Sequence, residues 1–343
     1  MGKKKKKYIS EENFNEKNLN FFYGIPHCHT GFSTGRGSPL EALEYGKNKN
    51  LDFMIITDHN KYLDEIDSSS KNHLTRWKIS KSIIEKFNKK HENFIALLGF
   101  ETKSSPWGHL NIINTSSFFN GVVKNLNSLA LWLMMEGNSI VSINHPQSSI
   151  INLPSPSLYN KFINLIEVAN GSYPNKYNKY YKNYFSMLDR GWKLSAINSQ
   201  DNHRINFGDR ENLTAIICSN KLTKESLIDS FKNGRTYSTE SKTLKFYFKI
   251  NDSFMGSTLY LKENDILNFY IYCEDSRYPI EKIYIYSNGG RLLKEVSNLS
   301  LNNVKYMIKL PYIIENNWYV IKLKQKGKKE ALSSPIYIYE KDD

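Results

Sequence analysis

From about residue 21 to residue 240, short apolar runs alternate with longer amphipathic stretches, a pattern that predicts strands alternating with helices. Several of the apolar runs are hydrophobic on both faces, as in a parallel sheet that helices cover. The predicted strands are 51–57, 94–100, 109–113, 139–144, 163–169, 193–198 and 213–218, and the predicted helices are 39–49, 75–90, 127–136, 177–190 and 224–233. Such a series of βα units predicts an α/β fold, either an open Rossmann-like sheet or a barrel.

The pattern changes after about residue 241. The segments that follow are rich in β-branched and aromatic residues, partly alternate with polar ones, and are separated by turn signals such as Asn288-Gly289-Gly290. The predicted strands here are 246–250, 266–273, 282–287, 304–310, 318–324 and 336–340. We therefore expect three parts: a polar basic tail over 1–20, an α/β region over 21–240, and a small all-β sandwich of immunoglobulin-like size over 241–343.

Composition and charge narrow the classes of protein. With 40% hydrophobic and 13% aromatic residues, the chain has the composition of a folded protein. The formal net charge is +13, but five of these charges belong to Lys3–Lys7, and the remaining +8 is spread along the chain among acids. A solvated surface is therefore favoured over nucleic acid as the reason for the charge. No apolar run approaches the roughly 20 residues that cross a bilayer.

Three cysteines that lie far apart, Cys28, Cys218 and Cys273, argue against a disulfide framework and favour a reducing cytoplasm. A protein whose signal sequence has been removed would look the same.

Histidines and acids gather where predicted strands end. In a parallel α/β barrel the carboxyl ends of the strands meet on one face, so these residues would be neighbours in space. The residues concerned are His27, His29, Asp58, His59, Glu101, His109, His145, Asp201 and His203. Imidazole and carboxylate groups together are ligands for zinc, manganese or iron, and six histidines are too many for one ion. The sequence thus predicts a site for two or three divalent ions.

Several motifs, in their order along the chain, resemble the polymerase and histidinol phosphatase (PHP) superfamily. They are PHCHTGFSTGRGSPLEAL, FMIITDHN, GFE followed by GHLNII, SINHPQ, IEVANG, QDNHR and GRTYSTES. The resemblance covers about residues 20–240 and is greatest to the branch that includes carbaryl-hydrolase-like metallohydrolases.

This resemblance implies a distorted seven-stranded (β/α) barrel that binds up to three divalent ions, commonly zinc, manganese or iron. Carried over motif by motif, His27, His29, Glu101 and Asp201 would hold one ion, with Glu101 as a bridge. His59 and His203 would serve a second ion, and His109 and His145 a third. Asp58 would either bind a metal or orient a neighbouring imidazole.

The chain departs from the family pattern after the HxH pair, where residues 32–36 contain no strong ligand. The sequence therefore leaves open whether the centre holds two ions or three. Arg36 could instead present its guanidinium to a substrate phosphate. Arg204, which follows His203, could do the same. For both arginines a solvated surface position is the alternative. The predicted catalytic residues are Asp58, His203, Arg36 and Arg204.

The function that these observations favour is hydrolysis of a small anionic phosphate ester by a metal-bound hydroxide. Hydrolysis of a carboxyl or carbamate ester is the alternative that the closer branch implies, and a non-catalytic, metal-stabilised binding module is the third. The C-terminal sandwich could recognise substrate, mediate dimerisation or shield the barrel. The sequence does not predict the oligomeric state.

Overall fold

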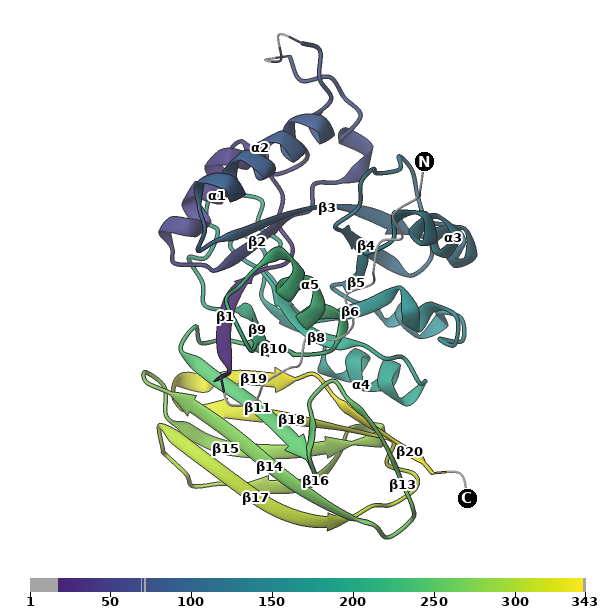
Figure 1. Ribbon diagram of the computed structural model, residues 1–343, viewed down its shortest axis with the longest axis vertical. Coiled ribbons are helices and arrows are strands. Elements are labelled where there is room, and N and C mark those ends of the chain that lie inside the picture. The colour runs from purple at the N-terminus through teal and green to yellow at the C-terminus, as the bar shows by residue number, and fades with distance from the viewer. Residues whose placement is uncertain (1–17, 69, 71, 342–343) are drawn as a thin grey trace, which may run out of the picture.

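The computed structural model describes residues 18–68, 70 and 72–341 (Figure 1). The predicted basic tail over 1–20 lies outside these residues except at its end, where Asn20 already begins strand β1. The α-helices in the described residues are α1 (Pro39–Asn48), α2 (Arg76–Lys90), α3 (Leu126–Glu136), α4 (Tyr181–Asp189) and α5 (Lys224–Lys232). All five predicted helices are thus confirmed. None of the helices within these ranges is long and apolar enough to span a membrane.

The N-terminal part of the chain forms a mixed sheet. Its strands are β1 (Asn20–Ile25), β2 (Phe53–Ile56), β3 (Ile95–Ser104), β4 (Gly108–Ile113), β5 (Ile140–Asn144), β6 (Ile163–Asn170), β7 (Asn178–Lys179), β8 (Ser195–Ser199), β9 (Leu213–Cys218) and β10 (Thr236–Thr239). Their order across the sheet is β10-β9-β1-β2-β3-β4-β5-β6, with β7 and β8 both paired to β6. Pairing is parallel within β1-β2-β3 and within β5-β6-β8, but β4 runs antiparallel to both β3 and β5. The expectation of a parallel sheet is therefore wrong at β4, and also at β9, which runs antiparallel to both β1 and β10.

The sheet curves until β8 returns to β9. Here the hydroxyl of Thr214 in β9 accepts a hydrogen bond from the Asn198 amide and donates one to the Asn198 carbonyl, both at 2.8 Å. Side chains from seven strands meet inside the curve, and α5 closes one end with Leu227, Ile228 and Phe231. The strand residues of this cluster are Phe53, Ile55, Leu97, Ile113, Ile140, Leu165, Ile197, Ile216 and Cys218, all buried.

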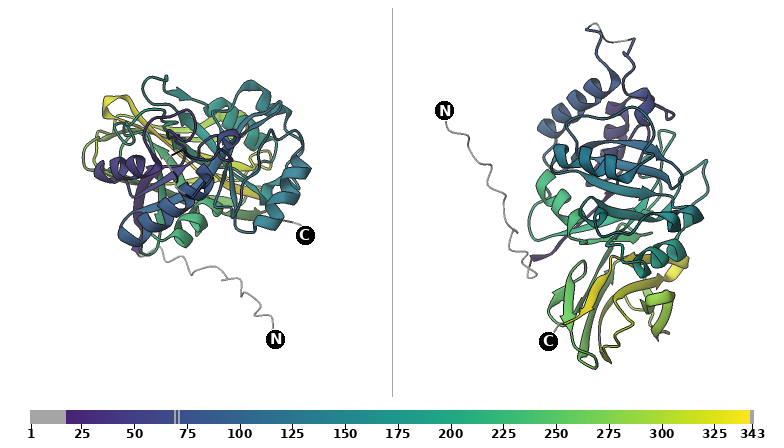
Figure 2. Two further views of the ribbon diagram at one scale, coloured as in Figure 1. Left: turned by 90° about the horizontal axis from the view of Figure 1, so that it is seen from above. Right: turned by 90° about the vertical axis from the view of Figure 1, so that its right-hand side faces the viewer.

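Helices cover the outer face of this sheet (Figures 1 and 2). Helices α1 and α2 bury Leu43 and Phe87 against Met54 of β2. Helix α1 begins at a capping box, in which Ser38 accepts from the amide of Glu41 and Glu41 accepts from the amide of Ser38. Helices α3 and α4 belong to a second outer cluster, over β4, β5, β6 and β8.

After residue 241 the described chain consists of strands and short 3-10 turns, with no α-helix up to residue 341. The strands are β11 (Leu244–Ile250), β12 (Ser253–Phe254), β13 (Thr258–Leu261), β14 (Ile266–Asp275), β15 (Ile280–Ser287), β16 (Arg291–Val296), β17 (Asn303–Pro311), β18 (Trp318–Gln325), β19 (Lys329–Ser333) and β20 (Ile336–Glu340). One sheet has the order β12-β11-β14-β17, and the other contains β13, β15, β16, β18, β19 and β20. Residues of both sheets form one hydrophobic cluster.

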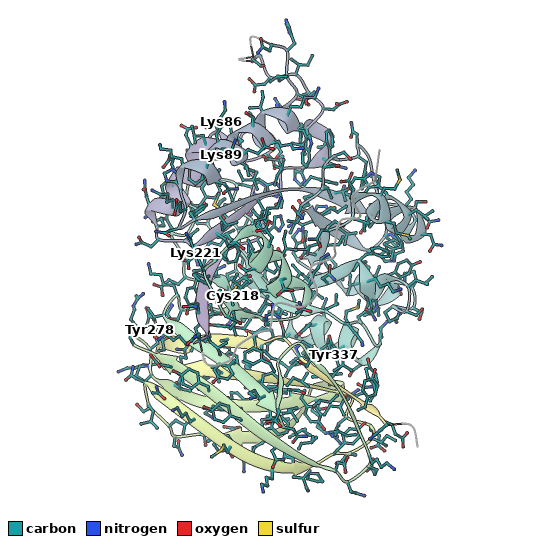
Figure 3. The ribbon with its side chains drawn as sticks, viewed as in Figure 1. Lys86, Lys89, Cys218, Lys221, Tyr278 and Tyr337 are labelled. Carbon is teal, nitrogen blue, oxygen red and sulfur yellow. The ribbon has the colours of Figure 1, made fainter. Side chains whose placement is uncertain are left out.

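The two parts of the chain are joined by a continuous sheet, because β19 pairs antiparallel with β10. They also share a core: Trp318 and Tyr337 belong to the same cluster as Tyr184 of α4. The Tyr337 hydroxyl lies 3.4 Å from the Leu194 carbonyl, and Tyr337 is labelled in Figure 3. The predicted division at residue 240 stays a prediction, as do the distorted seven-stranded (β/α) barrel and the immunoglobulin-like form of the sandwich. A mixed α/β chain with a large sheet is confirmed.

Candidate metal centre

All eight predicted metal ligands lie at the end of the N-terminal sheet that α5 does not close. His27 and His29 follow β1, His59 follows β2, His145 follows β5, and Asp201 and His203 follow β8. Glu101 and His109 lie within β3 and β4. The segments interlock through backbone hydrogen bonds, since the Asp201 amide donates to the His27 carbonyl and the His29 amide donates to the Asn202 carbonyl.

Strand alternation explains why these residues point into the curve of the sheet. Along β4, Ile113 faces the inner apolar cluster, so Asn111 and His109 face the same side at intervals of two residues. Along β3, Leu97 faces this cluster and Glu101, four residues later, faces the same side. The interior therefore changes from apolar at the α5 end to lined with imidazoles and carboxylates at the other end.

The Glu101 carboxylate is the centre of the site. It is 2% exposed, and each of its oxygens faces more than one imidazole. Oε1 lies 3.2 Å from His109 Nδ1, 3.4 Å from His145 Nε2 and 3.5 Å from His27 Nε2. Oε2 lies 3.1 Å from His59 Nδ1 and 3.4 Å from His29 Nε2.

Asp201 forms a second meeting point. Its Oδ1 lies 3.1 Å from His29 Nε2, 3.3 Å from His27 Nε2 and 3.7 Å from His203 Nδ1. This oxygen is buried and accepts no hydrogen bond from the residues that the structure describes. A buried carboxylate oxygen without a donor is costly in a protein alone, and a cation would satisfy it.

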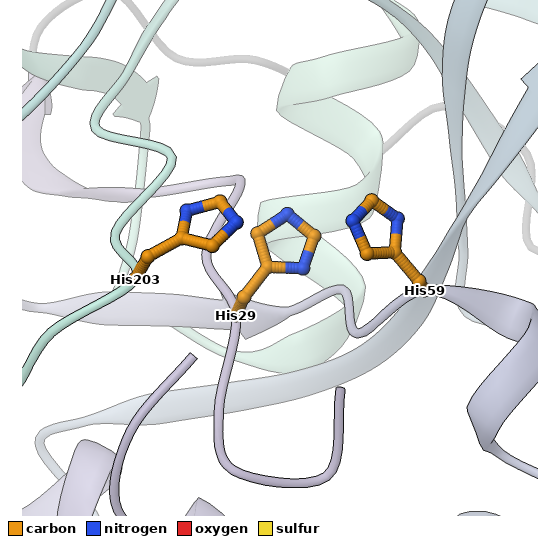
Figure 4. Close-up of side chains that lie close together, drawn as sticks. All are labelled: His29, His59 and His203. Atoms are coloured by element: carbon orange, nitrogen blue, oxygen red, sulfur yellow. The ribbon is translucent and has the colours of Figure 1, made fainter. Parts of the chain in front are cut away.

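The ligand atoms fall into three groups, in each of which all the atoms lie within 4.8 Å of one another. The groups are His27-His29-Asp201, Glu101-His109-His145 and His29-His59-His203. In the third group His29 lies between the other two rings, whose centroids are each 4.5 Å from its own (Figure 4). Zinc-to-nitrogen bonds of about 2.0–2.1 Å place two tetrahedral ligands about 3.3 Å apart. The separations of 3.1–3.5 Å around Glu101 and the 3.1 Å between His27 Nε2 and His29 Nε2 fit that spacing.

The electrostatics of the site also favour bound cations. Burial lowers the pKa of His27, but Asp201, Glu101 and Glu167 raise it, and the net pKa lies well above the ordinary value. The same balance of burial against Asp201 and Glu101 raises the pKa of His29 to about 9. Burial opposes ionisation of Glu101, yet His27 and the surrounding imidazoles hold its pKa well below the usual range. The buried carboxylates thus stabilise positive charge next to them, and divalent ions would supply that charge.

Glu167, which the sequence analysis did not single out, supports two of the ligands. It is fully buried, and its Oε1 lies 2.7 Å from Nδ1 of His27. Its Oε2 accepts from the amide of His145 at 2.5 Å and from Nδ2 of Asn170 at 2.6 Å. By accepting from Nδ1, Glu167 fixes the tautomer that leaves His27 Nε2 free to bind a metal. The signal was present, since a lone acid in the apolar run INLIEVA is unexpected unless it is paired.

Asp58 lies outside the three ligand groups. Its carboxylate accepts from the amide of Thr30 at 2.7 Å, from the hydroxyl of Thr30 at 2.6 Å and from the hydroxyl of Ser33. The Ser33 hydroxyl is also 3.4 Å from His29 Nδ1. Of the two predicted roles for Asp58, this position favours orienting an imidazole, acting through Ser33 on His29.

The two predicted substrate arginines are both exposed. Arg36 lies in the 31–37 loop that follows the HxH pair. Arg204 follows His203 directly, and its guanidinium carbon lies 5.1 Å from the centre of the Tyr173 ring. A ring contact of this kind holds a guanidinium in place while leaving its N–H groups available.

His145 and Asp201 have left-handed backbone conformations, with φ of 26° and 48°. Such values are strained for residues other than glycine, and they cluster at sites where the surrounding structure enforces them. Here both residues turn directly after a strand to aim their side chains at Glu101 or at His27 and His29.

No known family model matches the chain, and no curated protein sequence matches it. A solved structure of similar fold is a two-domain protein from Bacteroides vulgatus that contains a predicted PHP-like metal-dependent phosphoesterase. It is 15% identical, with a TM-score of 0.51, over 89% of this chain and 90% of that one. The resemblance to the PHP superfamily is thereby confirmed at the level of the fold, and the carbaryl-hydrolase-like branch stays a prediction.

Two further solved structures match 52% of this chain with lower TM-scores. One is a protein from Bifidobacterium adolescentis described as a predicted metal-dependent phosphoesterase, 11% identical, with a TM-score of 0.34 over 87% of that chain. The other is an amidohydrolase from Chromobacterium violaceum, 13% identical, with a TM-score of 0.32 over 86% of that chain.

Proposed function

We propose that this chain is a metal-dependent hydrolase of the PHP type that cleaves a small phosphate ester at a centre of two or three divalent ions. The observation that carries the proposal is the position of Glu101, whose two carboxylate oxygens face five imidazoles at 3.1–3.5 Å. A carboxylate shared in this way is suited to bridging ions. The similarity in fold to a protein with a predicted PHP-like phosphoesterase supports the same class.

Each ligand group would hold one ion. His27, His29 and Asp201 would form one position and Glu101, His109 and His145 a second, and His59 and His203 would contribute to a third. His29 belongs to both the first and the third group, but its one unprotonated ring nitrogen would bind a single ion. The nitrogen and carboxylate donors suit manganese, zinc or iron. Bound divalent ions make water a nucleophile near neutral pH and neutralise charge on the oxygens of the transferring group.

The remaining residues of the site position these ligands. Glu167 orients His27, and the Nδ2 group of Asn144 donates to Glu101 Oε1 at 2.9 Å. Asp58 fixes the Ser33 hydroxyl beside His29. Arg204 and Arg36 lie on the loops around the centre, where their guanidinium groups would bind anionic oxygens of the substrate. The net charge of +13 favours an anionic substrate in general.

The test is one comparison of rates. The metal-loaded protein is assayed with para-nitrophenyl phosphate, bis(para-nitrophenyl) phosphate and para-nitrophenyl acetate, each with manganese and with zinc. His27→Ala removes a central ligand, and His73→Ala, an exposed histidine outside the site, is the matched control. We expect metal-dependent turnover of one phosphate compound, lost in His27→Ala and kept in His73→Ala.

Each other result would change the assignment. Turnover of the acetate alone would make the protein a carboxyl or carbamate ester hydrolase. Metal binding without turnover of any compound would favour a non-catalytic, metal-stabilised module. Equal activity of His27→Ala and the unchanged protein would refute the centre itself.

A further inference from the structure

The segment 171–180, between β6 and α4, borders the metal centre. Its first residue, Gly171, donates from its amide to the carbonyl of Ser199 at 3.1 Å, two residues before Asp201. The Tyr173 carbonyl accepts from Nδ2 of Asn206 at 2.9 Å, and the Tyr173 ring lies against the Arg204 guanidinium. The segment and the 201–206 loop therefore form one wall beside His203.

The second half of this segment is held by two glutamates, Glu240 and Glu330, which we call the glutamate pair. Lys179 Nζ lies 2.6 Å from Glu240 Oε1 and 2.8 Å from Glu330 Oε2. The Tyr177 hydroxyl lies 2.9 Å from Glu240 Oε1, and the Tyr181 hydroxyl lies 3.2 Å from Glu330 Oε2. Glu330 belongs to β19, so the C-terminal sheet reaches the wall of the site directly.

The glutamate pair is well shielded from solvent. The side chains of Glu240 and Glu330 are 14% and 18% exposed, and Lys322 Nζ lies 2.7 Å from the second oxygen of Glu330. Burial opposes the ionisation of both partners, but the salt bridges prevail: the pKa of Lys179 is raised and that of Glu330 is lowered. Contacts of this kind are stronger than those between exposed ions, because less water competes for the charges.

Helix α4, which follows the segment, is fixed to the C-terminal sheets as well. The Phe185 ring stacks on that of Trp318 at 5.3 Å between centroids, and the Trp318 indole donates to Asp189 Oδ1 at 2.8 Å. The Tyr177 hydroxyl in turn accepts from Nδ2 of Asn198 in β8 at 3.0 Å. The C-terminal sheets therefore contact both ends of this region: Lys179 in the segment, and Phe185 and Asp189 in helix α4.

We propose that Glu330 and Glu240 are positioning residues, which hold the 171–180 segment so that Tyr173 places Arg204 to bind a second anionic group of the substrate. Since the bound ions would take the scissile phosphoryl group, an exposed arginine at the wall is available for an anion elsewhere in the substrate. The inference rests on the proposed function and deepens it: the preferred substrate is a phosphate ester whose leaving group carries its own negative charge.

Two substrates test this assignment. One is para-nitrophenyl phosphate, and the other is an aryl phosphate with an added carboxylate on the ring, both assayed with the metal-loaded protein. Arg204→Met removes the charge-assisted hydrogen bond and should raise the KM of the carboxylated compound about tenfold. Glu330→Gln should raise the same KM about threefold to tenfold while changing kcat, and both constants for the plain compound, by less than about twofold.

Control variants separate positioning from a general loss of structure. Glu295→Gln removes a more exposed salt bridge of similar length, Lys282–Glu295 at 2.7 Å, which joins β15 and β16 away from the segment. It should leave both substrates unchanged. Tyr173→Leu alters an exposed ring and should reproduce the effect of Glu330→Gln even if the latter folds poorly, and combining it with Arg204→Met should add little. Equal KM changes for the two substrates, or a fall in kcat alone, would overturn the proposal.

Deuterium exchange tests the positioning step without any turnover. Glu330→Gln should speed exchange of the amides in 171–180 relative to the unchanged protein and leave the α2 amides unchanged. Unaltered exchange in 171–180 would refute the role of Glu330 whatever the enzyme hydrolyses. Absence of phosphatase activity in the unchanged protein, with faster exchange in the variant, would refute the proposed function and the substrate assignment but leave the contact between the C-terminal sheet and this wall established.

Discussion

The two ends of the N-terminal sheet use the same strands for opposite purposes. At one end, α5 packs Leu227, Ile228 and Phe231 onto apolar residues that point inward from seven strands. At the other end, inward positions of these strands and the loops that follow them carry imidazoles and carboxylates. A polar layer lies between, in which Asn111 pairs in register with Ser142 and Glu101.

This difference shows how one sheet separates stability from chemistry. The apolar end excludes water and supplies burial energy, whereas the ligand end concentrates charge that proteins bury only when it is paired. Substitutions at the α5 end should therefore change the free energy of unfolding, and substitutions at the ligand end should change metal binding and turnover.

Glu101→Gln should have the largest effect. It keeps the size of the side chain but removes the charge that five imidazoles face, so kcat/KM should fall by about a thousandfold or more, which is about 4 kcal/mol. Steady-state assays and far-UV circular dichroism would be measured together. Retention of more than a tenth of the activity in a folded variant would contradict the central role of Glu101.

Phe231→Ala, at the opposite end, should lower the free energy of unfolding by about 3–5 kcal/mol. Phe231 is fully buried and meets Phe53 edge to face at 5.9 Å, so its removal leaves a cavity. Urea denaturation would measure the change, with Leu131→Ala, 66% exposed on α3, as the control. Below the unfolding transition, kcat should stay within about twofold; a large loss of kcat would mean that the two ends are not separate.

Glu167→Gln should weaken metal binding about 10-fold to 100-fold. The glutamine side chain cannot hold the His27 tautomer as the carboxylate does, and it is a weaker acceptor for the hydrogen bond that the His145 backbone N–H donates. Competition with a chelator would give the affinity, and Glu136→Gln, a partly exposed acid at the end of α3, is the control. Unchanged affinity would remove Glu167 from the site.

Ser38→Ala should have the smallest effect, a loss of about 1 kcal/mol in the free energy of unfolding. Ser38 caps α1 near the ligand end but belongs to none of the ligand groups, so metal affinity should not change. The Ser38 amide and, to a lesser extent, the Ser38 side chain lower the pKa of Glu41. The variant keeps the amide and loses the side chain, whose contribution is present above the ordinary pKa of Glu41 and is lost as the pH falls through the lowered pKa. The difference in melting temperature between the variant and the unchanged protein should therefore be smaller at low pH than at pH 7.

Much of this arrangement could be predicted from the sequence. Apolar runs followed directly by His, Glu or Asp made His59, Glu101 and His145 candidate ligands, and the structure brings these three side chains together, although Glu101 lies within β3 and not at its end. The five helices were predicted within a few residues of their observed ends, since each is strongly amphipathic or capped. These features depend on local sequence alone.

Other features depend on contacts between distant residues. The strands β16, RLLKEV, and β19, KEALS, have compositions that suit helices and become strands only through pairing with β15, β10 and β18. The antiparallel β3–β4 pair has a three-residue connection, too short for a parallel crossover, but the predicted end of β3 at residue 100 concealed this. The contact of Glu330 with Lys179 spans 151 residues, and no local pattern indicates it.

The most direct test of the account is to count the metal ions. The protein is loaded with manganese or zinc, freed of unbound metal by gel filtration, and analysed by mass spectrometry for metal per chain. Each of the three ligand groups contains a histidine that faces Glu101, and two of the groups share His29. This arrangement predicts two or three tightly bound ions per chain. One ion or none would contradict a centre built around a bridging Glu101.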